Sequence, residues 1–387
     1  MDNAAERLAV GLAELERRDL RRARRVVESA QGPRVRVGGR TLANFSSNDY
    51  LGLAGDGRLA EAARQAIDEY GVGAGASALV SGHLAVHERA EERFARFSGM
   101  PRALLFGSGY LANLGILAAL ADRDAHIFSD ALNHACLIDG ARLARAQVTV
   151  YPHLDMGALA EGLAASKAPV RIVATDAVFS MDGDIAPVPQ LVELCERHDA
   201  WLVLDDAHGV GVLGAAGRGT LEHFGIRSPR IVYMATLGKA LGGYGAFVSG
   251  EASLVEWLLQ RARTYIYSTA LPPMAAAVAT RALELMDEDR SLLASLRRRI
   301  GELHAALAGI GWRGALTQTA IQPVILGAAA RAVEVSARLA ECGMLVPAIR
   351  PPTVPEGTSR LRISLSAAHR AEEIEALASA LRGHLVP

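Results

Sequence analysis

The sequence WLVLDDAHG, residues 201–209, places an apolar run of strand-forming residues directly before two carboxylates and a histidine. Similar apolar runs recur along the chain, and stretches with helical patterning, such as residues 111–121 and 189–198, separate several of them. This alternation predicts an α/β layered domain with a largely parallel sheet, which would bind ligands at the carboxyl ends of its strands. The predicted strands are residues 103–106, 126–129, 148–151, 170–175, 201–205, 231–235 and 246–249.

The patterning predicts three parts in the chain. The first is an N-terminal helical arm over residues 1–43, in which residues 1–28 have the pattern of a charged amphipathic helix. The second is a large α/β domain over residues 44–285, which contains the seven predicted strands and would bind the ligand. The third is a smaller C-terminal α+β domain over residues 286–387, where helical patterns alternate with strand-like runs at residues 321–326 and 360–364.

Composition argues against several classes of protein. With 387 residues, 50% hydrophobic and 21% charged, the chain has ample material for a packed core. The net charge of -1 provides no global basic field for nucleic acid. No apolar run approaches the roughly 18 residues of a membrane span, and acids interrupt the first 25 residues, unlike a targeting peptide. The cysteines, which are widely spaced and odd in number, favour neither a disulfide framework nor a zinc site, so we expect a cytoplasmic protein. They are Cys136, Cys195 and Cys342.

Lysine is nearly absent. Only Lys167 and Lys239 are lysines, and the other 39 of the 41 basic residues are arginines. Arginine stays protonated in proteins and cannot form an imine, so a lysine kept in such a chain is a candidate for amine chemistry. Lys167 lies in a polar loop and is interpreted as a solvated surface charge. Lys239 follows an apolar run and has glycines nearby, which suits an imine with an aldehyde cofactor.

The turn FGSGYLAN, residues 106–113, follows a predicted strand and precedes a predicted helix. Its two glycines let the backbone approach a ligand, and free N–H groups at the start of a helix favour a phosphate. The string also fits a dinucleotide fingerprint, with Asp130 following at about the 20 residues that such a fingerprint expects. A plain glycine-rich turn is the third interpretation, and the motif alone does not decide among them.

The acids after the 201–205 strand allow four interpretations: a metal site, a helix cap, a structural hydrogen-bond cluster, or a carboxylate placed against a cationic ring nitrogen. A metal site would need further ligands at regular spacing beyond Asp205 and His208. The 106–113 turn, Asp205 and Lys239 follow three separate strands, and together they supply the parts of a pyridoxal phosphate site. A dinucleotide enzyme would use only the turn. We therefore predict pyridoxal 5′-phosphate as the cofactor, and no metal.

Six short segments match the motifs of one enzyme family. They are NFSSNDYLGL (44–53), NHA (133–135), VFSMDGD (178–184), DDAHG (205–209), TLGK (236–239) and YST (267–269). From about Leu20 to Leu381 the chain resembles the α-oxoamine synthases, fold-type I pyridoxal phosphate enzymes that condense an amino acid with an acyl thioester and release carbon dioxide. The resemblance implies an aspartate aminotransferase-like fold and a homodimer with active sites at its interface. The loop GAGASA, residues 73–78, departs from the family pattern, since Ala78 stands where relatives often carry arginine or histidine.

The resemblance implies a role for each residue of the cofactor site. Lys239 would hold the cofactor as a Schiff base and then remove the α-proton of the amino acid, while Asp205 would face the ring nitrogen. His208 would bond the phenolic oxygen, and His134 would lie over the ring face. The implied catalytic residues are thus Lys239, His134, Asp205 and His208. The implied cofactor-binding residues are these four with Gly109, Tyr110, Ser180 and Thr236, and Ser268 and Thr269 of the partner subunit.

Within the family, the segment AIRPPTVP, residues 348–355, points to the member that joins L-alanine to a pimeloyl thioester in biotin biosynthesis. The acyl group would arrive on coenzyme A or on an acyl carrier protein. The implied substrate-binding residues are Arg22, Asn48, His134, Arg350, Thr353 and Arg362, with Arg362 on the alanine carboxylate and Arg22 on the distal pimeloyl carboxylate or the carrier. The open alternatives are a glycine-using acetyl-coenzyme A ligase, an aminolevulinate synthase, a nicotinamide-dependent oxidoreductase and a noncatalytic partner subunit.

Overall fold

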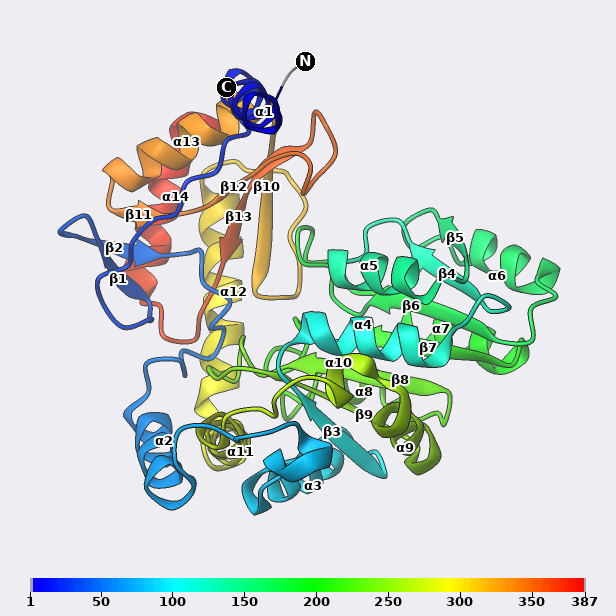
Figure 1. The fold of residues 1–387 in the computed structure, drawn as a ribbon. Helices are drawn as coiled ribbons and strands as arrows, with labels where there is room; N and C mark the ends of the chain where they lie inside the picture. Colours follow the sequence, from blue (N-terminus) through cyan, green and yellow to red (C-terminus); the bar gives the residue numbers. More distant parts are fainter. Residues whose placement is uncertain (1–2, 386–387) are drawn as a thin grey trace. The chain divides into compact units, whose positions relative to one another are not determined.

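A computed structural model describes residues 3–385, and its largest sheet has seven strands in the order β3-β9-β8-β7-β6-β4-β5 (Figure 1). The strands from β8 to β5 run parallel, and β9 is antiparallel to both of its neighbours. Each of the seven predicted strands overlaps one of these, so the predicted α/β class is confirmed. The strands are β3 (Arg102–Phe106), β4 (His126–Asp130), β5 (Gln147–Tyr151), β6 (Arg171–Asp176), β7 (Ala200–Asp205), β8 (Ile231–Thr236) and β9 (Ala246–Gly250).

Helices cover both faces of this sheet. The β3–β4 and β4–β5 connections move one way along the sheet and carry α4 and α5, whereas the β5–β6 and β6–β7 connections move the other way and carry α6 and α7. Because such crossovers are right-handed, α4 and α5 lie on one face and α6 and α7 on the other. Ile116 and Leu137, both fully buried, pack in one cluster with Val203 and Val232 of the sheet. The helices are α4 (Gly109–Leu120), α5 (Ala135–Ala144), α6 (Met156–Ala165) and α7 (Val188–Arg197).

The parallel strands bring polar residues to one edge of the sheet. Strand β4 ends at Asp130, β6 at Asp176, β7 at Asp205 and β8 at Thr236. Asp176 and Asp205 are direct neighbours in the register of β6 and β7. Strand β3 runs in the same direction as β8, so the N-terminus of α4 also begins at this edge. Ligands of α/β sheets bind at this kind of edge.

Contacts divide the chain into two compact units. The one with the seven-stranded sheet comprises Asn48–Ser180 and Asp184–Leu296. In it, α11 packs against α2 and α3. Its remaining helices are α2 (Gly57–Tyr70), the π-helical turn η1 (Ala78–Gly82), α3 (Ala85–Ser98), α8 (Thr220–Phe224), α9 (Ala252–Arg261), α10 (Arg263–Ile266) and α11 (Pro273–Glu288).

The other unit comprises the described residues of Met1–Ser47 and Arg297–Pro387, with Met181–Gly183. The segment predicted as an N-terminal arm therefore falls in the same unit as the C-terminal segment, and the boundary at residue 297 lies inside α12. Helix α13 packs on the sheet β10-β13-β12, and a second small sheet has the order β1-β2-β11. The elements are β1 (Arg34–Val37), β2 (Arg40–Asn44), α12 (Ser291–Gly309), β10 (Ile321–Gly327), α13 (Ala329–Glu341), β11 (Met344–Leu345), β12 (Ala348–Ile349), β13 (Ser359–Ser364) and α14 (Ala371–Leu385).

The helix predicted over residues 1–28 is shorter in the structure. Helix α1 spans Ala4–Arg17, and residues 1–2 lie outside the described residues. Asp19 follows with a positive φ of 54°, which a continuing helix does not allow. Beyond it, arginines at positions 21, 22, 24 and 25 would stand three and four residues apart in a helix and repel one another. The prediction was therefore wrong for residues 18–28, since the apolar periodicity stops at the end of α1.

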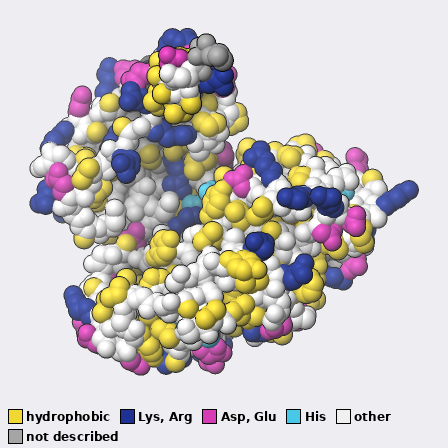
Figure 2. All heavy atoms as spheres, in the orientation of Figure 1, with side chains coloured by type: hydrophobic (Ala, Val, Ile, Leu, Met, Phe, Trp, Pro, Cys, Tyr) yellow, Lys and Arg dark blue, Asp and Glu magenta, His cyan; other side chains and the backbone are white. Residues whose placement is uncertain are grey.

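The described surface mixes charges of both signs. On the face drawn in Figure 2, basic side chains in dark blue and acidic ones in magenta lie interspersed. This distribution matches the near-neutral net charge of -1. Within residues 3–385, no helix has both the length and the apolar character needed to cross a membrane.

Candidate active site

A cavity of about 170 Å³ opens at the carboxyl edge of the seven-stranded sheet. Eight of the ten predicted cofactor-binding residues line it, although they come from distant parts of the sequence. They are Gly109, Tyr110, His134, Ser180, Asp205, His208, Thr236 and Lys239. Four further lining residues were not predicted: Cys136, Asp176, Ala207 and Met234.

Lys239 reaches a chain of hydrogen bonds in this cavity. Its Nζ lies 2.8 Å from His208 Nε2, and His208 Nδ1 lies 2.6 Å from the Tyr50 hydroxyl. That hydroxyl donates to Asn48 Oδ1 at 3.2 Å. An ammonium group only donates, so Nε2 accepts from Lys239, and the ring proton sits on Nδ1 and is donated to Tyr50. The chain fixes the imidazole, and the imidazole orients the amine.

Asp205 is buried at the end of β7, with 4% of its surface exposed. Its Oδ1 accepts from Ala207 N at 3.0 Å, and its Oδ2 accepts from Asn113 Nδ2 at 2.7 Å. Cys136 Sγ lies farther from Oδ2, at 3.9 Å. The two short bonds set the plane of the carboxylate, and Oδ1, which has one donor, can still accept a cationic N–H. Asn113 was not predicted as part of the site.

His134 is the N-cap of α5 and lines the cavity together with Asp176 and Asp205. Its backbone N donates to Asp176 Oδ2 at 2.8 Å. Burial lowers the pKa of His134, the charge of Asp205 raises it, and that of Lys239 lowers it, with a net decrease. Burial and the neighbouring charge of Asp205 raise the pKa of Asp176 well above its ordinary value. The cavity therefore contains a neutral imidazole beside a carboxyl group that tends to keep its proton.

The N-terminus of α4 forms another part of the cavity wall, where Gly109 and Tyr110 lie with Thr236. We call these three residues the polar cradle. Ser108 caps the helix by accepting from Leu111 N at 3.2 Å, and the first N–H groups of a helix have no carbonyl partner within it. A Cβ at Gly109 would lie 3.6 Å from the Met234 side chain and 3.8 Å from Thr236 Cβ, so Gly109 borders the same space as these two residues. The Thr236 hydroxyl donates to Gly245 O at 3.0 Å, so binding a phosphate requires it to exchange that bond.

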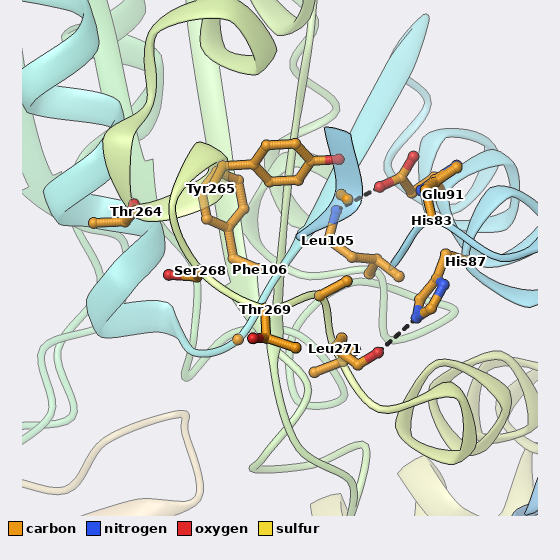
Figure 3. A pocket seen from close by; sticks show the side chains of 13 residues that line it. His83, His87, Glu91, Leu105, Phe106, Thr264, Tyr265, Ser268, Thr269 and Leu271 are labelled. Carbon is orange, nitrogen blue, oxygen red and sulfur yellow. Dashed lines mark hydrogen bonds between the residues drawn. The ribbon is translucent and has the colours of Figure 1, made fainter. Parts of the chain in front are cut away.

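Ser268 and Thr269 do not line the Lys239 cavity. They line a second cavity together with Ala78, the position that departs from the family pattern (Figure 3). Figure 3 shows His87 donating to the Leu271 carbonyl, at 2.7 Å, and Leu105 N donating to Glu91, at 2.9 Å. These bonds tie the 268–271 segment and β3 to helix α3. Whether Ser268 and Thr269 serve a partner's cofactor stays a prediction.

The remaining predicted substrate residues belong to the unit that contains the C-terminal segment. Arg22 Nη2 donates to Thr353 Oγ1 at 3.3 Å, and Arg350 donates to the Asp19 carbonyl. These three predicted residues therefore lie on one short stretch of surface. Arg362, 5% exposed on β13, donates to Ser364 Oγ at 2.8 Å. Their assignment to substrate stays a prediction.

The geometry does not support the dinucleotide interpretation of the 106–113 turn. Asp130, the acid that would bind a ribose, accepts from Leu132 N at 2.8 Å, His153 Nδ1 at 2.9 Å and Leu154 N at 3.0 Å. Its side chain is 1% exposed. An acid that is buried and already bound by three donors is not available to ribose hydroxyls.

His153 is expected to make folding stability depend on pH. Its ring bridges Asp130 and, at 2.7 Å, Asp184. Burial lowers its pKa, but hydrogen bonds to the two acids outweigh burial and raise it to about 9. Since this value exceeds the roughly 6.5 of an unfolded histidine, the stabilisation is complete below that pH and disappears as pH rises through about 9. The unfolding temperature of His153→Gln should lie furthest below that of the wild type near pH 6.

Exposed His223 offers a matched control, since it contacts neither acid. The unfolding temperature of His223→Gln should differ little from that of the wild type, and the difference should not depend on pH. A His153→Gln deficit that stayed constant or grew between pH 6 and 10 would contradict the bridge.

The residues present fit pyridoxal 5′-phosphate. The cavity places one lysine amine, one buried carboxylate and one helix N-terminus around a single space, with a histidine at its side. An amine can bind the aldehyde, a carboxylate the ring nitrogen, and backbone N–H groups the phosphate. Tyr50 bonds His208 and Asn113 bonds Asp205. Both lie in segments that the sequence had singled out, 44–53 and 106–113, but neither was predicted as a site residue.

Comparisons with known proteins agree with this fit. The family model for aminotransferase class I and II matches residues 40–381. The 8-amino-7-oxononanoate synthase of Janthinobacterium sp. (strain Marseille) is 53% identical over 377 residues, covering 96% of each chain. Serine palmitoyltransferase from S. paucimobilis with a bound PLP-myriocin aldimine has a TM-score of 0.91 at 28% identity, covering 98% of this chain and 96% of that one. The 8-amino-7-oxononanoate synthase of Francisella tularensis has a TM-score of 0.77 at 29% identity, covering 88% and 97%.

The fold and the cavity define a pyridoxal 5′-phosphate-dependent enzyme of fold-type I. This confirms the predicted cofactor and excludes the nicotinamide alternative. The chain belongs to the 8-amino-7-oxononanoate synthase family, whose members are acyltransferases of biotin biosynthesis.

Proposed function

We propose that this enzyme condenses L-alanine with a pimeloyl thioester. The products are 8-amino-7-oxononanoate, carbon dioxide and the free carrier thiol. The observation that carries the proposal is the grouping of Lys239, Asp205 and His134 around one cavity in a chain 53% identical to a protein named for this product. Other α-oxoamine synthases share the cavity chemistry, so the identity of the amino acid and of the acyl group needs a direct test.

Bound pyridoxal phosphate supplies an electron sink for negative charge at the α-carbon of an amino acid. We assign Lys239 Nζ to bind the cofactor and to move the α-proton of alanine, because it is the amine that lines the cavity. His208 Nε2, at 2.8 Å, orients this amine, and Tyr50 fixes His208 from its other side. An amine placed this way can take a proton and return it without leaving the site.

Asp205 is assigned to the ring nitrogen. A buried anion favours the protonated form of a nearby base, and its effect grows as water is excluded. His134 is assigned to cover the ring face, where a neutral imidazole adds no charge that would compete with Asp205. The N–H groups of Gly109 and Tyr110, with the Thr236 hydroxyl, are assigned to the phosphate, and Ser180 to the rim of the same cavity.

The carboxylates of the two substrates need cationic partners. Arg362 is assigned to the alanine carboxylate, because a guanidinium fork matches that planar anion. Arg22, Arg350 and Thr353 are assigned to the acyl substrate, and the bond from Arg22 to Thr353 supports treating them as one set. Asn48 is also assigned to substrate binding, because its hydrogen bond with Tyr50 connects it to the Lys239 cavity.

We propose a homodimer in which Ser268 and Thr269 of the partner subunit complete the phosphate site. Two observations support it. These residues line a cavity separate from that of Lys239 in their own chain. Large apolar side chains near them are exposed, with Tyr267 at 70% and Val80 at 79%, which is typical of a surface covered by another chain.

Product analysis tests the proposed function. The holoenzyme is incubated with L-alanine and either pimeloyl-coenzyme A or pimeloyl-acyl carrier protein, while thiol release and product mass are followed. We expect the mass of 8-amino-7-oxononanoate and one carbon dioxide per thiol. Glycine with acetyl- or succinyl-coenzyme A serves as the control and should release little thiol. Faster turnover of a glycine pair would instead assign the enzyme to another member of the α-oxoamine synthases.

A further inference from the structure

A buried chain of polar side chains joins the two groups assigned to the cofactor ring. Asn113 Nδ2 donates to Asp205 Oδ2 at 2.7 Å and to Cys136 Sγ at 3.0 Å. Cys136 Sγ in turn lies 2.9 Å from His134 Nδ1. Asn113 is fully buried and Cys136 is 2% exposed. The buried pair thus connects Asp205 on β7 with His134 at the start of α5, and of these four residues only His134 is exposed.

The direction of each hydrogen bond follows from the groups present. If the Asn113 amide were turned over, its oxygen would face the Asp205 carboxylate, and two acceptors would repel, so the NH2 group faces Asp205. Its two hydrogens go to Asp205 and to the sulfur. Burial, reinforced by the charge of Asp205, raises the pKa of Cys136, so the thiol keeps its one proton. Two acceptors lie within reach, Asp205 Oδ2 at 3.9 Å and His134 Nδ1 at 2.9 Å, and we assign the proton to the shorter contact.

The receiving atom is His134 Nδ1, which accepts from the thiol and from Cys136 N at 3.3 Å. A nitrogen that accepts two hydrogen bonds carries no proton, so a neutral His134 carries its proton on Nε2. The titratable groups that line the cavity with this ring include Asp205, Asp176 and Lys239, and burial lowers the pKa of His134. Cys136 thereby fixes the tautomer of His134, and Asn113 fixes both Cys136 and Asp205.

We propose that Asn113 and Cys136 are positioning residues that hold Asp205 and His134 as one hydrogen-bonded unit around the cofactor ring. This inference rests on the proposed function in that it assigns Asp205 and His134 to that ring. A purely structural pair would satisfy buried polar groups and contribute to folding alone. A positioning pair also sets the tautomer of His134 and the electrostatic environment of the bound cofactor, and both can be measured apart from turnover.

The first test is the protonation of His134 in the holoenzyme. Long-range proton–nitrogen NMR on enzyme with 15N-labelled histidine distinguishes a proton on Nε2 from one on Nδ1, and the spectrum of His134→Gln identifies the His134 signal. We expect the Nε2–H form in the wild type and a smaller share of it in Cys136→Ala, where the backbone N of residue 136 remains as a donor to Nδ1 after the thiol is removed. A wild-type spectrum with the proton on Nδ1 would overturn the inference without any variant.

The second test follows the absorbance of the bound cofactor with pH. In Cys136→Ala and Asn113→Leu, the pH at the midpoint of this absorbance titration should move by at least about half a pH unit. The kcat should fall about tenfold, while KM for alanine changes little. Cys136→Ser keeps a donor and an acceptor and should recover most of the loss. Cys195, a buried cysteine on α7 outside the cavity, gives the matched control Cys195→Ala, which should leave the midpoint and the tautomer unchanged.

Loss of thermal stability alone, with tautomer, midpoint and kcat preserved in Cys136→Ala and Asn113→Leu, would reduce the pair to a structural role. The NMR and absorbance readouts need only the bound cofactor. If the wild type failed to use alanine and a pimeloyl thioester, the proposed function would fall while these two readouts still decided the role of the pair.

Discussion

Lys239→Ala is expected to lose the near-visible absorbance of the bound cofactor and to lower kcat/KM for alanine by about 10³- to 10⁴-fold. The variant removes the amine assigned both to bind the cofactor and to move the α-proton. No other lysine lines the cavity, and the arginines of the chain stay protonated and cannot replace it. The absorbance spectrum and thiol release, measured on the same purified sample, check both parts.

The only other lysine gives a matched control. Lys167 is exposed in the loop between α6 and β6, so Lys167→Ala should keep the absorbance and the activity. If Lys239→Ala kept its absorbance while Lys167→Ala lost it, the amine chemistry would belong to the surface loop, and the assignment of this cavity would be wrong.

Asp205→Ala is expected to lower the rate of α-proton exchange of alanine by about 10²- to 10³-fold, the size seen when a preorganised charge is removed from a site. Without the carboxylate, the ring nitrogen loses the partner that favours its protonated form. The loss of deuterium from α-deuterated alanine, measured without any acyl substrate, isolates this step. Asn113 Nδ2 also loses its partner, so stability should fall by about 1–3 kcal/mol.

Asp206, the residue next to Asp205, provides a control that separates loss of α-proton exchange from loss of stability. Asp206 is also buried, accepts from Tyr233 and Thr220, and does not line the cavity. Asp206→Asn should therefore lose stability while keeping α-proton exchange. Undiminished exchange in Asp205→Ala, at a cofactor occupancy equal to that of the wild type, would remove Asp205 from the role assigned to it.

The seven strands of the large sheet could be predicted because each is a short apolar run bounded by polar or glycine-containing segments. Strands β1 and β2 were missed, because sequences such as RVRV and RTLAN carry arginines and have few apolar residues. The helix over residues 1–28 was predicted too long, since the apolar spacing that ends with α1 was extended into the arginine-rich residues that follow it. These failures lie in segments where local pattern is weak.

Lys239, Asp205 and His208 were predictable because they follow strands, and the carboxyl ends of parallel strands share one edge. The same reasoning would have found Asp176, which ends a predicted strand. Asn113 ends the 106–113 turn, but its role could not be found this way, because its contact with Asp205 spans 92 residues of sequence and forms only in the folded chain. A residue whose role is to orient another has no motif of its own.

The most direct test of the account is to reduce the holoenzyme with borohydride and map the modified peptide by mass spectrometry. Reduction makes the link between the cofactor aldehyde and a lysine amine permanent, so the added mass identifies the residue. We predict that the label lies on Lys239, in the peptide that contains TLGK. A label on Lys167, or an active enzyme in which neither lysine carries the added mass, would contradict it.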